Sequence, residues 1–422
     1  MRILVSTSTF PLQQNDSLPR FVFDLAVGLS AGGEVTALVP GAAGYPQRER
    51  MGVVDVERFT YFLPRRLQAL AYGHGMRDNF RGSWAAKLQP LPFLLAQALA
   101  TRSVVRSKGV TVVNSHWLVP QGLSTALARG RQESFHHILS VHAADVYLLR
   151  KLPFGRALAR FVLSRTDVVF ADGSHVRDSL DELIGRPSGA QLQPNGVWVD
   201  VFRGHQDMEP VEVPFKEGYL LFFGRFAEKK GITYLLKALP RVREKYPGLG
   251  LFLIGYGALE SQIREEVASL GVADRVHFLG RQPHSEIVRY LKACRAAVIP
   301  SIIDQHGETE GMPTVVLEAM ASGTRVIGTA VDGIPDVLRH QDNGWLCREK
   351  DAEDLAEKII MALEDPRADT IVESALATAD RFDWSCVAGR YVETIRGLEA
   401  GRSAVARDNA RDERRSQIEA DE

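Results

Sequence analysis

Short apolar runs alternate with amphipathic stretches through the first half of the chain. The amphipathic stretches, at residues 21–29, 94–105 and 156–163, place apolar side chains at the spacing of a helix that packs on a sheet. Such alternation is typical of a parallel, doubly wound sheet. The runs that predict strands are residues 2–6, 35–39, 110–114, 138–141 and 168–170.

The second half repeats this scheme, which predicts a second sheet. Its strands are expected at residues 219–223, 249–254, 276–278, 297–299 and 325–328. Two such halves indicate an α/β protein with two Rossmann-like domains. The helices between these strands are expected at residues 231–245, 259–270, 285–293 and 313–322.

A turn signal separates the two halves. Pro194, Asn195 and Gly196 are followed by a polar stretch that contains prolines and ends near residue 216. A linker there would act as a hinge. We place the first domain at 1–200, the linker at 201–216, the second domain at 217–382, and a disordered, charged tail at 401–422.

Two further segments have a distinct composition. Residues 383–400 predict one long amphipathic helix. Residues 44–90 are rich in Gly, Pro and Arg, and they fit an excursion of the first domain with short helices.

The composition is that of an ordinary soluble protein, with 45% hydrophobic and 24% charged residues. No run reaches the roughly eighteen apolar residues that a membrane span requires, and the first residues enter a strand directly, so we expect a cytoplasmic protein. The three cysteines, Cys294, Cys347 and Cys386, are far apart and lack metal-ligand spacing. We therefore expect neither disulfides nor a bound metal.

Charge is distributed unevenly along the chain. Residues 1–204 carry 23 Lys and Arg against 15 Asp and Glu, whereas the remainder carries 28 against 37. A basic first domain can meet an anionic membrane surface or an anionic acceptor. The helix expected at 154–165 interleaves cations with apolar residues, which suits such contact, but packing of its apolar stripe on the sheet is the more common explanation.

Two glutamates, Glu310 and Glu318, flank the expected start of a helix. Pro313 suits a first helical position, and Gly311 permits close approach of backbone to a ligand. The free amides and the positive dipole end of this helix favour binding of a phosphate group. Chance spacing is the alternative explanation for the two carboxylates.

A second candidate follows the first strand of the second domain. There Gly224 permits a turn, and Arg225 and Lys230 place cations before a helix, where they are misplaced electrostatically unless an anion joins them. Together they can neutralise a diphosphate, unless they are only a solvated cluster of charges. Gly257 belongs to a turn with too few glycines for a dinucleotide fingerprint, so the motif argues against NAD.

Two histidines end strands of the first domain. His116 precedes Trp117, and His142 is followed three residues later by Asp145. Ligands bind at the carboxyl ends of strands in open α/β sheets, so both histidines are candidates for a site. Structural roles are the alternative for all four residues.

These segments resemble the retaining glycosyltransferases of family 4. The resemblance rests on Glu310, seven residues, Glu318 and then Ala-Met-Ala-x-Gly, and on Gly-Arg, four residues, Lys-Gly at 224–231. It covers about residues 1–400. It implies the GT-B fold: two Rossmann-like domains facing a cleft, with the helix at 383–400 crossing back to the first domain.

The resemblance also implies roles for individual residues. Arg225 and Lys230 would bind the diphosphate, Glu310 the sugar hydroxyls and Glu318 the ribose. Arg281 and the turns at Gly224 and Gly257 would lie by the nucleotide. The backbone of Gly311, Met312, Pro313 and Thr314 would lie near the phosphates, His142 near the transferred sugar, and His116, Trp117 and Asp145 on the acceptor side.

The resemblance implies transfer of a hexose-type sugar from a nucleoside-diphosphate sugar to a glycan or lipid-linked glycan, in assembly of a cell-surface polysaccharide or glycolipid. No cofactor, metal or nucleic acid is implied. The chain departs from the family in lacking a Gly-Gly pair near Asn15, and in having Gly-Met-Pro after Glu310 where Phe-Gly is usual. An epimerase of sugar nucleotides and a non-catalytic glycan-binding protein remain alternatives.

Overall fold

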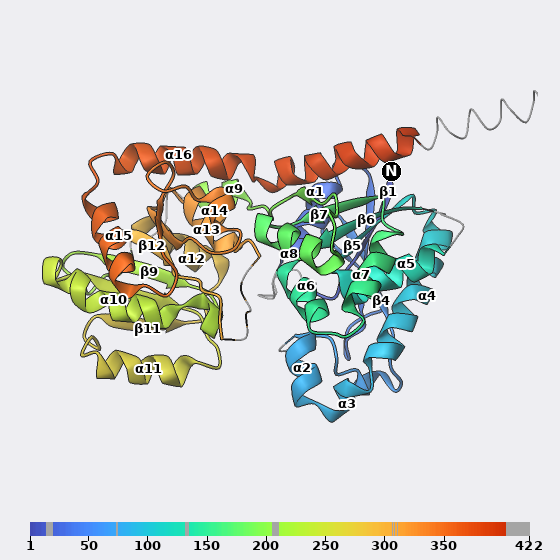
Figure 1. Ribbon diagram of the computed structural model, residues 1–422, viewed down its shortest axis with the longest axis horizontal. Coiled ribbons are helices and arrows are strands. Elements are labelled where there is room, and N and C mark those ends of the chain that lie inside the picture. Colours follow the sequence, from blue (N-terminus) through green and yellow to red (C-terminus); the bar gives the residue numbers. More distant parts are fainter. Residues whose placement is uncertain are drawn as a thin grey trace, which may run out of the picture.

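The computed structural model contains two parallel-sheet domains side by side (Figure 1). The first sheet has eight strands in the order β3-β4-β2-β1-β5-β6-β7-β8. Its strands are β1 (Arg2–Ser6), β2 (Glu34–Pro40), β3 (Arg48–Met51), β4 (Val54–Phe59), β5 (Val112–His116), β6 (His136–Val141), β7 (Val168–Ala171) and β8 (Gln191–Leu192). The structure describes residues 1–13, 20–72, 75–130, 135–204, 211–305, 307, 309 and 311–401.

Helices cover both faces of this sheet because its central strands are buried on both sides. All neighbouring strands pair in parallel except β3 and β4, which form an antiparallel hairpin at one edge. The helical segments are α1 (Phe21–Leu29), η1 (Arg65–Leu67), α2 (Met76–Gly82), α3 (Trp84–Lys87), α4 (Pro90–Lys108), η2 (Leu118–Gly122), α5 (Leu123–Arg129), α6 (Ala143–Arg150), α7 (Gly155–Leu163) and α8 (Ser174–Ile184).

The hairpin lies in the segment 44–90, for which only short helices were predicted. Short helices α2 and α3 are present, but β3 and β4 were missed. In β4, buried side chains alternate with part-buried ones, as expected for a strand near the edge of a sheet.

The second sheet has six strands in the order β11-β10-β9-β12-β13-β14, all paired in parallel. The strands are β9 (Tyr219–Phe223), β10 (Gly250–Ile254), β11 (Val276–Gly280), β12 (Ala296–Ile299), β13 (Val326–Thr329) and β14 (Trp345–Cys347). Buried clusters on its two faces hold the helices in place. The helical segments are α9 (Val199–Arg203), η3 (Glu228–Lys230), α10 (Ile232–Lys245), α11 (Glu260–Ser269), α12 (His284–Ala293), α13 (Thr314–Ala321), α14 (Ile334–Val337), α15 (Ala352–Glu364) and α16 (Ala368–Arg381).

The chain crosses between the domains twice at one place. Val197 exchanges two backbone hydrogen bonds with the returning segment, donating to Phe382 at 2.9 Å and accepting from Trp384 at 3.0 Å. Val199 and Phe202 pack in the core of the second domain. Residues 205–210 of the predicted linker lie outside the described residues.

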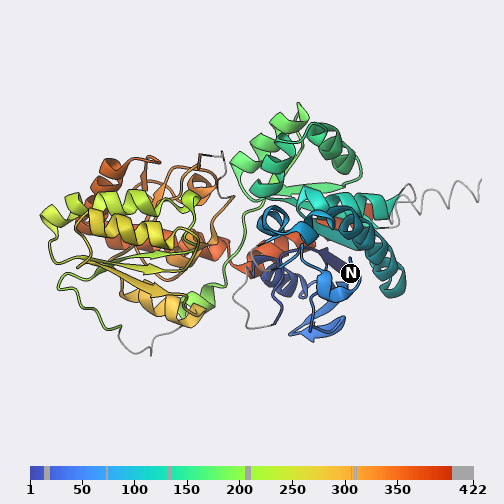
Figure 2. The ribbon, with the colours of Figure 1, turned by 90° about the horizontal axis from the view of Figure 1, so that it is seen from below.

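The last helix, residues 384–401, returns to the first domain, as the resemblance implied (Figures 1 and 2). Trp384, Tyr391 and Ile395 are buried in the same cluster as β1 and α1. The Tyr391 hydroxyl lies 2.9 Å from the Ser140 hydroxyl at the centre of the sheet. The helix therefore braces the first domain, while the preceding α16 packs on the second. Residues 402–422 lie outside the described part of the chain.

In the described part of the chain, no helix combines the length and the apolar character that a membrane span needs. The same residues contain no group of three or more His, Cys, Asp or Glu side chains arranged to hold a metal ion.

Candidate active site

The turn after β9 places Gly224 and Arg225 at the carboxyl end of the second sheet. The Gly224 amide donates to the Ile254 carbonyl at 2.9 Å. Gly255 has a φ of 145°, and a Cβ at this position would overlap the Gly224 carbonyl oxygen. The turns after β9 and β10 therefore pack backbone to backbone, with Gly257 in the second turn and the Arg225 side chain exposed.

The following turn is fixed against the loop after β12. Gly231 has a φ of 64°, and a Cβ there would overlap the Pro300 carbonyl oxygen, so only glycine fits. The Lys229 carbonyl accepts from the Ile302 amide at 2.9 Å. The ammonium group of Lys229 donates to the Thr309 carbonyl at 3.2 Å. These bonds hold the lysine pair beside the loop that leads into α13.

Lys230 extends back towards the first glycine turn. Its Cε lies 3.8 Å from the position that a Cβ on Gly224 would occupy, and the residue is half-buried. The structure thus brings the lysine and the Gly224–Arg225 turn together, as a diphosphate clamp requires.

Helix α13 begins at Thr314, with Pro313 as its N-cap. Pro313 therefore stands one residue before the first helical position that we predicted for it. Met312 is buried, and the Gly311 carbonyl accepts from the Gly333 amide at 3.0 Å. The amino-terminal amides of α13 follow the loop that Lys229 binds, so cations and a helix dipole share one region.

Glu318 lies inside α13 and faces helix α12. Its Oε1 is 3.8 Å from Nε2 of His284, and the interaction with Glu318 raises the pKa of His284. The His284 ring also contacts Phe202 edge-on, with 5.7 Å between ring centroids. Glu310 lies outside the described residues, so its role stays a prediction.

Arg281 projects from the turn after β11. Its guanidinium group lies over the Tyr256 ring, 5.2 Å from the centroid. The turn is bonded to the neighbouring one, since the Gly255 amide donates to the Gly280 carbonyl at 2.8 Å. Arg281 is therefore a neighbour of the turn that contains Gly257.

On the first domain, three adjacent strands end in a chain of hydrogen-bonded side chains. Nδ1 of His116, at the end of β5, lies 3.2 Å from Nε2 of His142, which follows β6. Nδ1 of His142 lies 2.9 Å from a carboxylate oxygen of Asp172, which follows β7. All three residues are buried. Burial lowers the pKa of His116 well below its usual value, so its ring is neutral at pH 7.

Within this series of three side chains, two polar atoms have no hydrogen-bond partner among the described residues, namely Nε2 of His116 and Oδ1 of Asp172. Buried polar atoms are almost always bonded, and such exceptions point to a missing ligand or water. The chain from His116 to Asp172 therefore has hydrogen-bonding capacity to offer a substrate.

Asp145 supports this arrangement from the start of α6. Its carboxylate accepts from the backbone amides of Leu118 and His142, the latter at 3.2 Å. Burial raises the pKa of Asp145 to about 7. The Trp117 ring packs on the His142 ring, with 4.9 Å between the ring centroids. Asp145 therefore fixes the backbone shortly after His116 and at His142. The apolar ring of Trp117 packs beside both histidine rings.

The two domains meet at this point. A Cβ on Gly311 would lie 2.5 Å from the Asp172 carboxylate, so the loop before α13 directly contacts the end of β7. Beside it, the Ser174 amide donates to the Asp336 carboxylate of the second domain at 2.7 Å. The structure thus brings the candidate residues of the first domain next to Gly311.

Helix α7 is the segment whose basic residues suggested membrane contact. Arg156 and Arg160 donate to the carbonyls of Leu183 and Ile184, both at 2.9 Å, at the end of α8. Ala159 and Val162 are buried against the domain core. These contacts favour the packing explanation for this helix.

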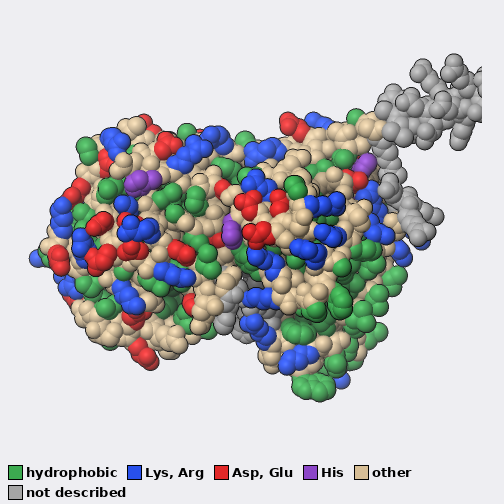
Figure 3. All heavy atoms as spheres, viewed as in Figure 1, with side chains coloured by type: hydrophobic (Ala, Val, Ile, Leu, Met, Phe, Trp, Pro, Cys, Tyr) green, Lys and Arg blue, Asp and Glu red, His purple; other side chains and the backbone are tan. Residues whose placement is uncertain are grey.

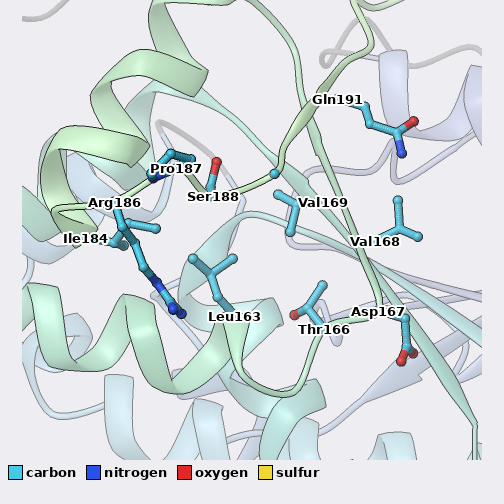
Figure 4. Close-up of a pocket in the computed structure, with 11 residues that line it drawn as sticks. Leu163, Thr166, Asp167, Val168, Val169, Ile184, Arg186, Pro187, Ser188 and Gln191 are labelled. Carbon is cyan, nitrogen blue, oxygen red and sulfur yellow. The ribbon is translucent and has the colours of Figure 1, made fainter.

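A cavity of about 280 Å³ lies elsewhere on the first domain (Figure 4). It is lined by Thr166, Asp167 and Val168 at the start of β7, and by Arg186 and Ser188 after α8. Asp172 is at the opposite end of β7, so this cavity is separate from the candidate site.

Two residues of the site were missed by sequence reasoning. Asp172 directly follows a buried strand, as His142 does, so the strand-end rule that selected the histidines applied to it as well. His284 had no such signal. Its importance comes from Glu318, which is far away in the sequence but close in the fold.

Comparison with known proteins relates the second domain to a family. Residues 205–376 match the model of the family described as glycosyl transferases group 1. Over 72% of this chain and 80% of its own length, an uncharacterised glycosyltransferase of Methanocaldococcus jannaschii is 26% identical. The second domain of this chain is a domain of the glycosyl transferases group 1. The matched region contains every candidate residue of the second domain.

Solved structures confirm the predicted GT-B fold. Sucrose-phosphate synthase from Thermosynechococcus elongatus superposes with a TM-score of 0.74 at 22% identity, covering 95% of this chain and 99% of its own. Anabaena HepE in complex with UDP-glucose gives a TM-score of 0.66 at 17% identity, over 94% and 100% of the two chains. At such identities, these likenesses show the fold of this chain.

Proposed function

We propose that this glycosyltransferase is a retaining enzyme that transfers a hexose-type sugar from a nucleoside-diphosphate sugar to a hydroxyl of a glycan or lipid-linked glycan. The observation that carries the proposal is the junction of two second-domain loops. The loop of Gly224 and Lys230 is bonded, through Lys229, to the loop that leads into α13. Cations and free helix amides in one place suit a diphosphate.

On the second domain, Arg225 and Lys230 stabilise the leaving diphosphate, where negative charge grows as the bond to the sugar breaks. Preorganised cations of this kind commonly supply the largest electrostatic contribution to catalysis. Glu318 accepts hydrogen bonds from the ribose hydroxyls, and Arg281 contacts the base. Glu310 binds sugar hydroxyls. The complex of HepE with UDP-glucose supports a nucleotide-sugar donor on this fold.

On the first domain, His142 binds the transferred sugar, since it lies beside the contact of Asp172 with Gly311. His116 and Trp117 line the acceptor side. The acceptor hydroxyl attacks the anomeric carbon from the face that the diphosphate leaves. The bond from that carbon to the diphosphate oxygen breaks, a bond to the acceptor oxygen forms, and the released oxygen takes the acceptor proton.

We propose that no cofactor takes part and that the fixed cations and the helix dipole replace a divalent metal ion in charge neutralisation. We further propose that the product belongs to a cell-surface polysaccharide or glycolipid. Activity that survives treatment with a chelator supports the metal-independent mechanism, whereas loss of activity restored by Mg²⁺ or Mn²⁺ contradicts it.

A screen of nucleotide sugars, read by thermal stabilisation and by slow donor hydrolysis, tests the proposal. The expected result is stabilisation by one nucleoside diphosphate and its sugar conjugate, with hydrolysis that retains the anomeric configuration. Isomerisation of the sugar nucleotide without any acceptor would instead identify an epimerase. Binding of glycans without turnover of any donor would identify a non-catalytic relative.

A further inference from the structure

Exposed apolar side chains concentrate at one end of the first domain. Of the sixteen large apolar side chains that are exposed in the described part of the chain, eight lie between residues 63 and 99. Figure 3 shows apolar side chains gathered on the end of the domain where α2, α3 and α4 lie. We define the α3–α4 face by Trp84, Leu88, Leu91, Leu95 and Leu99.

Helix α4 is apolar on two opposite sides. Phe93 and Val104 face the domain and are buried. On the other side, Leu91, Leu95 and Leu99 recur at intervals of four and are 66%, 51% and 64% exposed. A helix that is hydrophobic all round is ordinarily covered all round, so this outward stripe indicates that something else covers it.

The face is held by hydrogen bonds at its centre. The side-chain oxygen of Gln89, just before α4, accepts from the amides of Ala69 at 2.9 Å and Leu70 at 3.1 Å. Its side-chain nitrogen donates to the Leu67 carbonyl at 2.6 Å. Gln89 is fully buried, and it ties the exposed Leu67 to the beginning of the leucine stripe. The apolar surface is thus preformed.

Charge identifies the kind of partner. Residues 61–108 contain eight Lys and Arg but a single acidic residue, Asp78. Arg66, Arg81 and Lys87 are exposed around the apolar residues. A second copy of the chain docked on this face would bring like charges together, whereas anionic lipid headgroups would neutralise them.

We propose that the α3–α4 face docks on an anionic bilayer, with its leucines among the acyl chains, Trp84 at the interface and its cations at the headgroups. Trp84 is 80% exposed, and tryptophan is the side chain that prefers the membrane interface. Apolar area combined with cations is the composition that binds such surfaces. This proposal goes beyond the transfer reaction, and it places membrane contact on α3 and α4 in place of α7.

The docking is tested by sedimentation with vesicles of phosphatidylcholine, with or without an equal part of phosphatidylglycerol. The wild type is expected to pellet only with the anionic vesicles, and less as salt is raised. The triple variant Leu91→Ser, Leu95→Ser, Leu99→Ser should lower the partition coefficient by about tenfold or more. A matched control removes three exposed apolar side chains at the end of α6 and in the turn before α7, with Leu148→Ser, Leu152→Ser and Phe154→Ser.

Trp84 supplies a readout that does not depend on the triple variant. Anionic vesicles should shift the tryptophan emission of the wild type to shorter wavelength, and Trp84→Phe should remove the shift while still pelleting. Hydrolysis of donor without acceptor should be unchanged in all these variants, which separates this proposal from the proposed function. Absence of pelleting, equal loss in the control variant, or a stable dimer that the triple variant dissociates would each overturn the membrane assignment.

Discussion

The two surfaces that meet at Gly311 and Asp172 are built in opposite ways. On the second domain, glycine turns pack backbone to backbone, while the charged Arg225 and Lys230 keep access to solvent. On the first domain, His116, His142 and Asp172 form a buried chain of hydrogen bonds.

The difference fits the separate tasks that we propose for the two domains. A diphosphate arrives with its charge, so its site needs cations that stay hydrated until the ligand replaces the water. A sugar carries hydroxyls without charge, and a fixed set of buried hydrogen-bonding groups orients it. Changes on the second domain should therefore impair donor binding, whereas changes on the first should impair transfer after the donor has bound.

The largest effect is expected from the second domain. Lys230→Ala and Glu310→Ala should each lower sugar transfer by about a hundredfold to a thousandfold, because preorganised groups that bind the diphosphate and the sugar are lost. Steady-state kinetics with the identified donor measure this effect. Lys237→Ala, on the exposed side of α10, is the matched control and should retain wild-type rates. Wild-type activity in either site variant would refute the assigned site.

A smaller loss is expected on the first domain. Asp172→Asn should lower kcat by roughly tenfold to a hundredfold, since His142 then lacks the carboxylate that orients its ring. Nucleotide affinity, measured by calorimetry, should be unchanged. Equal losses of nucleotide affinity and of kcat would show that Asp172 also contributes to donor binding, which we assign to the second domain.

The pair of Glu318 and His284 offers a third test, on the donor side. Glu318 raises the pKa of His284, so the pair stabilises the folded protein below the usual histidine pKa of about 6.5, and this contribution is lost as pH rises through the raised value. In Glu318→Gln the pKa of His284 should fall, as followed by NMR of the ring protons. An unchanged titration would mean that the two side chains do not interact in solution.

His137, buried in the first domain, should show the opposite pH dependence. Burial lowers its pKa to about 4, so the folded protein loses stability as pH falls from about 6.5 towards 4. The loss should reach at most about 3 kcal/mol, and His137→Gln should flatten it. Denaturant unfolding at several pH values measures it. A steeper pH dependence in the variant would contradict the assignment.

Much of the fold followed from local patterns, whereas part of the site depended on contacts between distant segments. Strand β9 and helix α1 have the predicted bounds, because continuous apolar runs and regular helical spacing are strong signals. The hairpin of β3 and β4 was missed, since its residues lie in a segment rich in Gly, Pro and Arg. His284 was missed because its partner Glu318 belongs to another helix.

The surface residues show a similar difference. Cations interleaved with apolar residues drew attention to α7, yet Arg156 and Arg160 bind the end of α8. The exposed stripe of α4 could not be predicted, because the sequence of this helix is apolar on both of its sides. Only the fold shows which of those two sides faces outward.

The most direct test of the central claim is the affinity of nucleoside diphosphates for the wild type, Lys230→Ala and Asp172→Asn, measured by calorimetry on the full chain. We predict that one nucleoside diphosphate binds the wild type, that Lys230→Ala weakens this binding by about tenfold or more, and that Asp172→Asn leaves it unchanged. Undiminished binding to Lys230→Ala would contradict a diphosphate site formed by the second-domain loops.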